Sequence, residues 1–345
     1  MGGIPKRDPF RSAGLFAPTE ARYPRWCMHM SMDDLWRLHA REGYAAVAAT
    51  MGSVSATDHF FVALLAFGEQ DLGGALSQSR VAAALEPTSI LFAEATRYLE
   101  RVVAGGKHKV YASGDAFGAF IRGGGNTRLY RALSAALRAA YRQHAAARLL
   151  DVGVGDGLAL LPAIDDHIAS VTLVEPSLPM LTTTADALAR RGVAHQPHHR
   201  TLQAFARDWS GVGWDIAQAT FSLQSIPPDE RASLLAWMRG AARRVLIAEF
   251  DLPRFEAMGA PDQVRYVKSR YERGLAEYAD DGGLVARGFL MPVMFGYFDR
   301  TSARTNYEQP IGAWAEDLRR AGFTHVEAWP LDDYWWAPAH LLDAW

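Results

Sequence analysis

The sequence of 345 residues contains a single cysteine, Cys27, which excludes an internal disulfide. So few thiols are typical of proteins in a reducing compartment, and we expect a cytoplasmic location. Long apolar runs are also lacking. The longest, at 60–67, is much too short to cross a bilayer core of about 30 Å, so we expect no membrane partner.

Blocks of basic residues are absent as well. The 36 Lys and Arg are balanced by 38 Asp and Glu, for a net charge of −2, which argues against a nucleic-acid partner. His195, His198 and His199 lie close together, but no carboxylate or cysteine stands at a matching spacing, so we expect no metal. Hydrophobic residues make up 49% of the chain, enough for a sizeable core, and the length favours two substructures.

The most informative segment is a strand that ends in a glycine-rich turn. Residues 149–152 are apolar apart from Asp151, as expected of a buried strand. Three alternating glycines follow it: Gly153, Gly155 and Gly157. Glycine has no Cβ, so a nucleotide-like ligand can approach the main chain closely here. A second apolar strand, at 171–174, is followed directly by Glu175, whose carboxylate can accept hydrogen bonds from both hydroxyls of a ribose.

Two classes of ligand use this layout. Dinucleotide-binding proteins need G-x-G-x-x-G, but Leu158 stands where the third glycine would be. The spacing D-x-G-x-G-x-G instead resembles the first motif of class I S-adenosyl-L-methionine (SAM)-dependent methyltransferases, whose ligand carries no phosphate. Later segments resemble that family's remaining strands in the same order: 213–228 the fourth strand and its loop, 244–251 the fifth, 322–327 the start of the sixth and 334–339 the seventh.

The resemblance covers roughly 128–345 and implies an α/β fold with a Rossmann-like sheet of seven strands. Residues 1–127 are helical in pattern from Ser31 onwards, and we expect an N-terminal helical lobe that covers the substrate. The interval 252–310 is unlike the family's common pattern. We expect it to be a cap inserted after the fifth strand.

The resemblance also implies which residues bind SAM. The three glycines let the main chain pass under the ligand, Glu175 accepts the ribose diol, and Asp151 orients the loop or reaches the amino group through water. The adenine edge is expected at Thr201 and Leu202, although the acid that the family usually has there is missing. The methionine part is expected to contact the residues after the fourth strand: Thr220, Phe221 and Ser222.

A second glycine-rich turn, 122–126, precedes the helix that leads into the first strand. In the family this segment commonly lies over the methionine end of SAM. Arg122 is expected to pair with the methionine carboxylate by a charge-assisted contact. For Asn126 two roles stay open, holding the cofactor or capping the following helix.

The acceptor is expected to be a small aromatic molecule, because the chain holds 10 Trp, 12 Tyr and 16 Phe. The helical lobe, the turn at 120–126 and the end at 334–338 resemble a narrower group. These are bacterial natural-product enzymes that methylate carbon 3 of an indole and trigger pyrroloindoline closure. That reaction needs a base, which Tyr23 with His29, or Glu249, would supply.

Three alternatives stay open. One is an O- or N-methyltransferase, which acts on phenols, carboxylates or amines. Another is an NAD-dependent oxidoreductase, and a third is a SAM-binding protein without catalysis. By analogy with the family, a homodimer is also expected.

Overall fold

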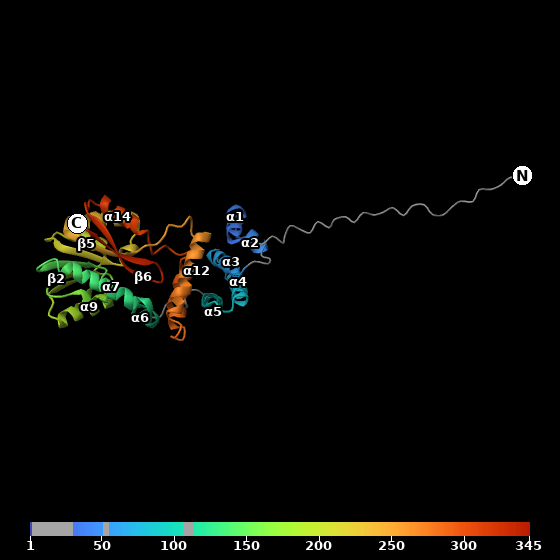
Figure 1. The fold of residues 1–345 in the computed structure, drawn as a ribbon, viewed down its shortest axis with the longest axis horizontal. Helices are drawn as coiled ribbons and strands as arrows, with labels where there is room; N and C mark the ends of the chain where they lie inside the picture. The colour runs from blue at the N-terminus through green and yellow to red at the C-terminus, as the bar shows by residue number, and fades with distance from the viewer. Residues whose placement is uncertain (2–29, 51–54, 106–113) are drawn as a thin grey trace.

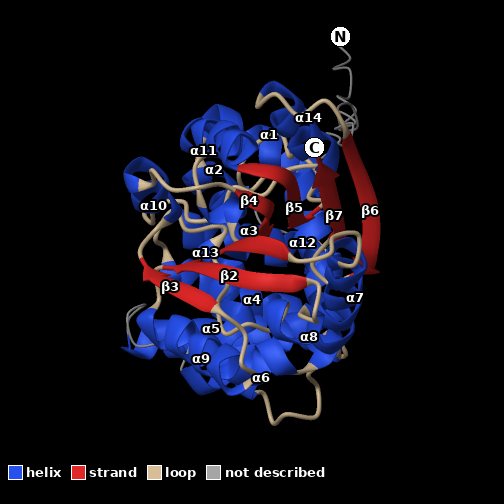
Figure 2. Cartoon of the chain, turned by 90° about the vertical axis from the view of Figure 1, so that its left-hand side faces the viewer, coloured by secondary structure: helices blue, strands red, loops and turns tan. Residues whose placement is uncertain are grey.

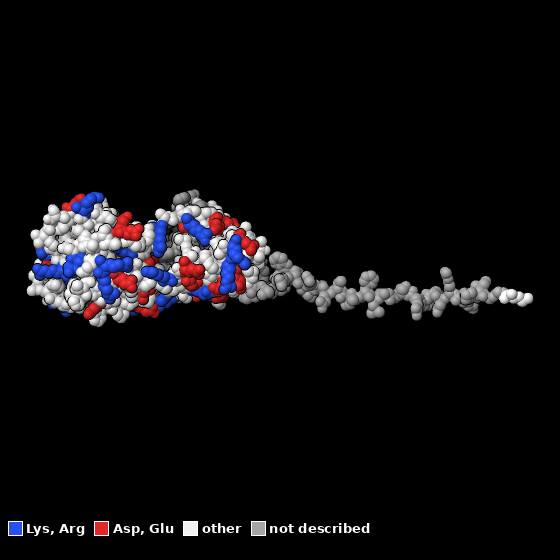
Figure 3. Space-filling model, turned by 90° about the horizontal axis from the view of Figure 1, so that it is seen from above, with Lys and Arg blue, Asp and Glu red and all other residues white. Residues whose placement is uncertain are grey.

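The computed structural model describes residues 1, 30–50, 55–105 and 114–345. An α/β domain and a helical lobe lie side by side, with the long helix α12 (Pro261–Ala276) between them (Figure 1). Basic and acidic side chains are interspersed over both parts on the face drawn in Figure 3. Among the described residues, no helix combines the length and apolarity that crossing a membrane requires.

The α/β domain is built on a sheet to which the described residues contribute seven strands: β1 (Ala147–Val152), β2 (Ile168–Glu175), β3 (His195–His199), β4 (Trp214–Thr220), β5 (Ala242–Phe250), β6 (Val326–Asp333) and β7 (Pro338–Ala344). Their order is β3-β2-β1-β4-β5-β7-β6. Strands β1 to β5 pair in parallel, whereas β7 is antiparallel to both β5 and β6. The Rossmann-like seven-stranded fold is therefore confirmed, with an antiparallel strand that the dinucleotide order lacks.

Helices cover both faces of the sheet (Figure 2). One face packs on α7 (Gly124–Tyr141), α8 (Leu160–Ala163) and α9 (Leu178–Arg190). The other packs on α10 (Leu202–Asp208), α11 (Pro228–Ala241) and α14 (Ile311–Arg320). Leu149 and Leu150, neighbours on β1, belong to the two different cores because side chains alternate along a strand. This double coverage explains the continuous apolar runs in the central strands.

In the part of the lobe that the structure describes, the first five helices are α1 (Met32–Glu42), α2 (Tyr44–Thr50), α3 (Ala56–Gly68), α4 (Leu72–Leu85) and α5 (Ile90–Gly105). The predicted start of α1 is confirmed, because Ser31 and Asp34 form a capping box. Helix α3 contains the longest apolar run, and nearly all its residues are buried. It is the central helix of the lobe, which explains an apolar run without a polar face.

The interval 252–310 holds α12, a π-helical turn at Ala286–Leu290 and α13 (Met291–Gly296). Its apolar side chains share one core with the helical lobe. Tyr98 of α5, for example, stacks on Phe295 of α13 with ring centres 4.7 Å apart. The insertion therefore completes the lobe and joins it to the end of β5.

The prediction for the seventh strand was wrong in position. Residues 334–337 form the turn between β6 and β7, and β7 begins only at Pro338. The side chains of Trp335 and Trp336 are buried in the core that the helical lobe shares with the insertion. Packing against Tyr271 of α12, rather than pairing in the sheet, holds these two rings in place.

Candidate functional site

The glycine-rich loop after β1 leaves one glycine open to a ligand. Gly153, Gly155 and Gly157 all have positive φ angles, of 67°, 58° and 80°. A Cβ on Gly153 would lie 2.4 Å from Cβ of Ser222, and one on Gly157 would lie 2.8 Å from Leu161. At Gly155 a Cβ would meet nothing within 4 Å. Packing thus requires the outer two glycines, while the middle one faces open space.

Glu175, the last residue of β2, faces this open glycine. Its side chain is buried, Oε2 accepts a hydrogen bond from the Gly155 N–H at 3.0 Å, and Oε1 accepts one from the Ser177 N–H at 2.8 Å. A carboxylate has about four lone-pair sites, so both oxygens retain capacity for further donors. Glu175 is therefore placed to fix the loop and accept a ligand's hydroxyl groups together.

Asp151 lies beneath the loop as part of a buried polar chain. Its Oδ2 accepts from Nε2 of Gln218 at 2.7 Å, and Gln218 accepts in turn from the Tyr141 hydroxyl. Burial raises the pKa of the Asp151 carboxyl to about 7. Its Oδ1 has no hydrogen-bond partner among the described residues. That oxygen is free to accept a donor from a ligand or a water.

The end of β4 carries backbone strain beside the loop. Thr220 ends the strand, and Phe221 follows with a φ of 53°, a conformation that costs a non-glycine residue about 1–2 kcal/mol. Ser222 then donates its hydroxyl to the carbonyl of Val152 at 2.9 Å. The Phe221 ring stacks on Phe250 at 4.6 Å. Strained residues of this kind cluster at ligand sites.

Arg122 is the last residue of α6 (Gly114–Arg122), and its guanidinium pairs with Asp156 of the glycine-rich loop at 2.7 Å. A groove of about 510 Å³ runs along α6, α7 and this loop, with Arg122, Tyr130 and Leu158 among its lining residues. Tyr130 meets the Phe221 ring edge-on at 6.1 Å. Arg122 is thus an exposed cation beside the loop, within reach of a carboxylate bound there.

Asn126 does not cap α7, so that alternative was wrong. The helix begins at Gly124 with Gly123 as its N-cap, which puts Asn126 inside the first turn. Its buried amide donates to Tyr278 of the insertion at 3.0 Å and accepts from the Tyr334 hydroxyl at 3.0 Å. Asn126 therefore joins three distant segments and holds the α6–α7 junction against the site.

Thr201 and Leu202 have structural roles in this structure. The Thr201 hydroxyl caps α10 by accepting from the Ala204 N–H at 3.3 Å. The Leu202 side chain is 4% exposed and packs in the core between the sheet and α11. Nearby, His199 contacts the carbonyl of Pro176, so this segment does lie next to the end of β2. The adenine assignment of Thr201 and Leu202 stays a prediction.

Glu249 is fully buried at the end of β5. Its Oε1 accepts from the Gln224 N–H at 3.1 Å, while Oε2 has no hydrogen-bond partner among the described residues. Burial raises the pKa of this carboxyl to about 8. Glu249 thereby positions the loop after β4, and its role as a base stays a prediction. Tyr23 and His29, the other candidate bases, lie outside the described residues.

The raised pKa of Glu249 predicts a pH effect on stability. Between about pH 4.5 and pH 8 the folded protein keeps this proton while the unfolded chain releases it. The stabilisation is therefore fully present below pH 4.5 and is lost as the pH rises towards 8. We expect the melting temperature of Glu249→Gln to fall less than that of the wild type over this range. Asp151 titrates in both proteins, so an equal fall in both would contradict the assignment.

Sequence reasoning missed four residues that the structure brings to the site: Tyr130, Asp156, Gln218 and Tyr278. Asp156 stands inside the glycine motif itself, and Gln218 is a polar residue in the middle of an apolar strand, so both carried a local signal. Tyr278 gave no such signal, because it is 152 residues from its partner Asn126.

Comparison with known proteins found neither a matching family model nor a matching curated protein. Solved structures with a similar chain path include methyltransferases. A Nostoc punctiforme protein, provisionally an O-methyltransferase, matches with a TM-score of 0.42 and 14% identity. The match covers 63% of this chain and only 56% of the length of that protein.

A Burkholderia thailandensis N1-methyltransferase, solved with 1,6-didemethyltoxoflavin and S-adenosylhomocysteine, has a TM-score of 0.42 and 19% identity over 63% of this chain and 77% of its own. The mitomycin 7-O-methyltransferase has a TM-score of 0.41 and 15% identity over 91% of this chain and 73% of its own.

Proposed function

We propose that this chain is an enzyme that transfers the methyl group of SAM to a small aromatic molecule. The observation that carries the proposal is the open Gly155, bonded to Glu175 at the carboxyl ends of β1 and β2. Ligands of open α/β sheets bind at that edge. A glycine held at positive φ with free space before it, next to a carboxylate, fits an adenosyl group and needs no phosphate contact.

The surrounding residues suit the other parts of SAM. Glu175 would accept the ribose hydroxyls, and the free Oδ1 of Asp151 would accept from the amino group through a water. Arg122 would exchange Asp156 for the methionine carboxylate, a strong charge-assisted contact. The main chain after Phe221 would contact the methionine part. SAM supplies an electrophilic methyl group and leaves as S-adenosyl-L-homocysteine (SAH).

An aromatic acceptor is supported by the rings that lead away from this site. Phe221, Phe250 and Tyr334 stack in series, with neighbouring ring centres 4.6 and 5.4 Å apart. Such rings line pockets for flat apolar substrates and can also face a sulfonium. The enzyme's contribution to the rate is then chiefly alignment of the acceptor atom with the methyl carbon, which can supply up to roughly 10 kcal/mol.

We further propose that the acceptor atom is carbon 3 of an indole and that the product closes to a pyrroloindoline. In this reaction the bond between the SAM sulfur and the methyl carbon breaks as carbon 3 bonds to the methyl group. The side-chain nitrogen of the acceptor then bonds to carbon 2, and a base takes up the proton that this nitrogen releases. The candidates for that base are Tyr23, His29 and Glu249. The proposal draws on the resemblance in sequence together with the aromatic stack.

Incubation of the full chain with methyl-labelled SAM and a panel of indoles and phenols tests the proposed function. We expect a labelled indole whose mass spectrum places the methyl group on carbon. A labelled phenol or amine instead would favour an O- or N-methyltransferase. No labelled product from any acceptor, despite tight binding of SAH, would favour a SAM-binding protein without catalysis.

A further inference from the structure

The segment that follows the insertion returns to the carboxyl edge of the sheet. The Tyr307 N–H donates to the carbonyl of Gln224, in the loop after β4, at 2.7 Å. Two residues on, Gln309 forms a bridge with Asp251, directly after β5. Glu308 between them therefore lies beside the loops that end β4 and β5. An acceptor must approach the methyl donor from this edge.

The Glu308 carboxylate is held in place by two neutral donors. Its Oε1 accepts from Nε1 of Trp336 at 2.7 Å, and its Oε2 accepts from the Tyr297 hydroxyl at 3.1 Å. Among the described residues, no Lys or Arg nitrogen forms an ion pair with it. Removal from water raises the pKa of the carboxyl, and the hydrogen bonds from Trp336 and Tyr297, followed by the charge of Arg304, oppose that rise only in part. A carboxylate with little access to water gains most from a positively charged partner.

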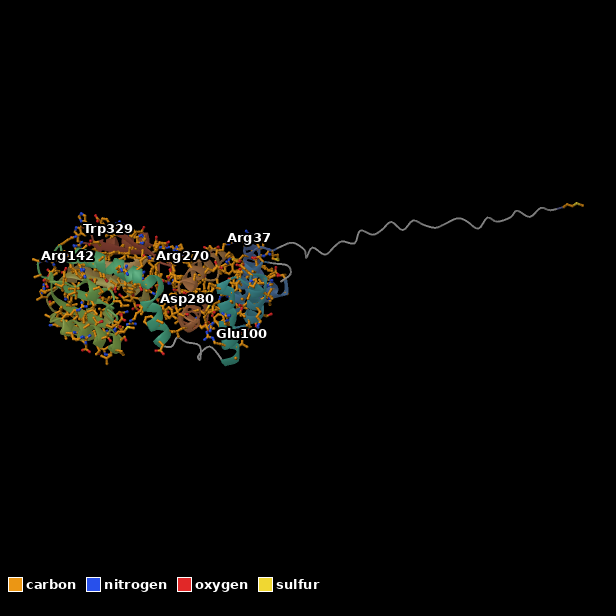
Figure 4. All side chains as sticks on the ribbon, turned by 60° about the horizontal axis from the view of Figure 1, so that its bottom comes forward. Arg37, Glu100, Arg142, Arg270, Asp280 and Trp329 are labelled. Carbon is orange, nitrogen blue, oxygen red and sulfur yellow. The ribbon has the colours of Figure 1, made fainter. Side chains whose placement is uncertain are left out.

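Electron-rich rings surround this carboxylate. Tyr297 stacks on Trp336 at 5.1 Å, and Tyr266 of α12 meets Trp336 edge-on at 5.8 Å. Tyr266, Tyr297 and Glu308 are all partly exposed, so each of these three residues is in contact with solvent. One of these rings already contacts a cation: the guanidinium of Arg270, labelled in Figure 4, lies 5.3 Å from the Tyr266 ring centre. Rings with a nearby carboxylate form the usual site for an ammonium group.

A neighbouring buried atom also lacks a donor. Glu249 lies close enough for the Glu308 charge to raise the pKa of the Glu249 carboxyl, which keeps its proton at neutral pH. Oε1 of Gln224, which can only accept, is buried without a hydrogen-bond partner among the described residues. A ligand that reaches Gln224 must therefore bring a hydrogen-bond donor.

We propose that Glu308 and the rings of Tyr266, Tyr297 and Trp336 bind a protonated amine carried by the aromatic acceptor. The inference rests on the proposed function, because it identifies the substrate class of the same enzyme. The acceptor is then an aromatic amine, and neither an aromatic acid nor an uncharged ring is the preferred substrate.

Calorimetric binding of three probes to the full chain tests this, with and without saturating SAH: tryptamine as the cation, indole as the neutral ring and indole-3-acetate as the anion. We expect tryptamine to bind tightest. In Glu308→Gln its affinity should fall at least roughly 10-fold, the loss expected for one hydrogen bond to a charged group. Indole affinity should change by less than about 3-fold, because the rings remain. Glu316→Gln, an exposed residue on α14, is the matched control and should bind all three probes like the wild type.

Equal tryptamine affinities in the wild type and Glu308→Gln would overturn the proposal. If circular dichroism shows that this variant does not fold, the wild-type affinities alone test the proposal. A wild type that binds tryptamine no more tightly than indole-3-acetate also overturns the proposal. A wild-type chain that does not bind SAH but still prefers tryptamine would contradict the proposed function and would support the amine site.

Discussion

Replacing Glu175 with alanine is expected to weaken SAH binding by roughly 100-fold. By the proposed assignment, the variant would lose two charge-assisted hydrogen bonds to the ribose, each worth about 1.5–3 kcal/mol, and it also releases the Gly155 N–H. Titration calorimetry measures the dissociation constant directly. Glu175→Ala also leaves the N–H groups of Gly155 and Ser177 without this partner, so circular dichroism must show a folded variant before the affinities are compared.

Two further variants show whether the effect is specific. Glu175→Gln keeps an oxygen that can accept from Gly155 but removes the charge, so its loss of affinity should be intermediate. Glu327→Ala removes an exposed glutamate from β6, at the far edge of the sheet, and should leave SAH binding unchanged. A Glu175→Ala protein that binds SAH as the wild type does would remove the ribose assignment.

Adding a single methyl group at Gly155 is expected to weaken SAH binding strongly. The Cβ of Gly155→Ala would project into the open space where the adenosyl group is proposed to lie. A loss of roughly 100-fold or more is reasonable for a ligand that must pass against the main chain.

The chain offers a matched control for the backbone strain of this change. Gly192, in the turn after α9, has a φ of 70°, and a Cβ added there would also meet nothing within 4 Å. Both alanine variants should therefore lose about 1–2 kcal/mol of unfolding free energy, measured by chemical denaturation. Only Gly155→Ala should lose SAH binding. Equal SAH affinities in the two variants would show that the space at Gly155 is not part of a ligand site.

The part of the site proposed to bind SAM could be predicted from sequence because its determinants are local. The β1 strand, the alternating glycines and Glu175 follow one another within 29 residues, and each has a distinct physical signature. The positive φ angles of Gly153, Gly155 and Gly157 are the reason that glycine is needed at those positions. The apolar runs of β1 and β2, together with the family resemblance for β4 and β5, likewise predicted most of the parallel part of the sheet.

The part of the site proposed to bind the methyl acceptor could not be predicted, because its contacts span long sequence separations. The Tyr334 hydroxyl bonds to Asn126 across 208 residues, which no local pattern records. The aromatic run at 334–336 has strong β-propensity, but tertiary packing with the insertion makes it a turn. Glu308 stands in an interval without any motif, and main-chain contacts of its neighbours Tyr307 and Gln309 bring it to the sheet edge.

The central claim is that the loop after β1 binds an adenosyl sulfonium rather than a dinucleotide. Titration of the wild-type chain with SAH and, separately, with NAD tests it most directly. We predict that SAH binds with one site per chain and that NAD produces no saturable heat. Saturable binding of NAD, with no binding of SAH, would contradict the account.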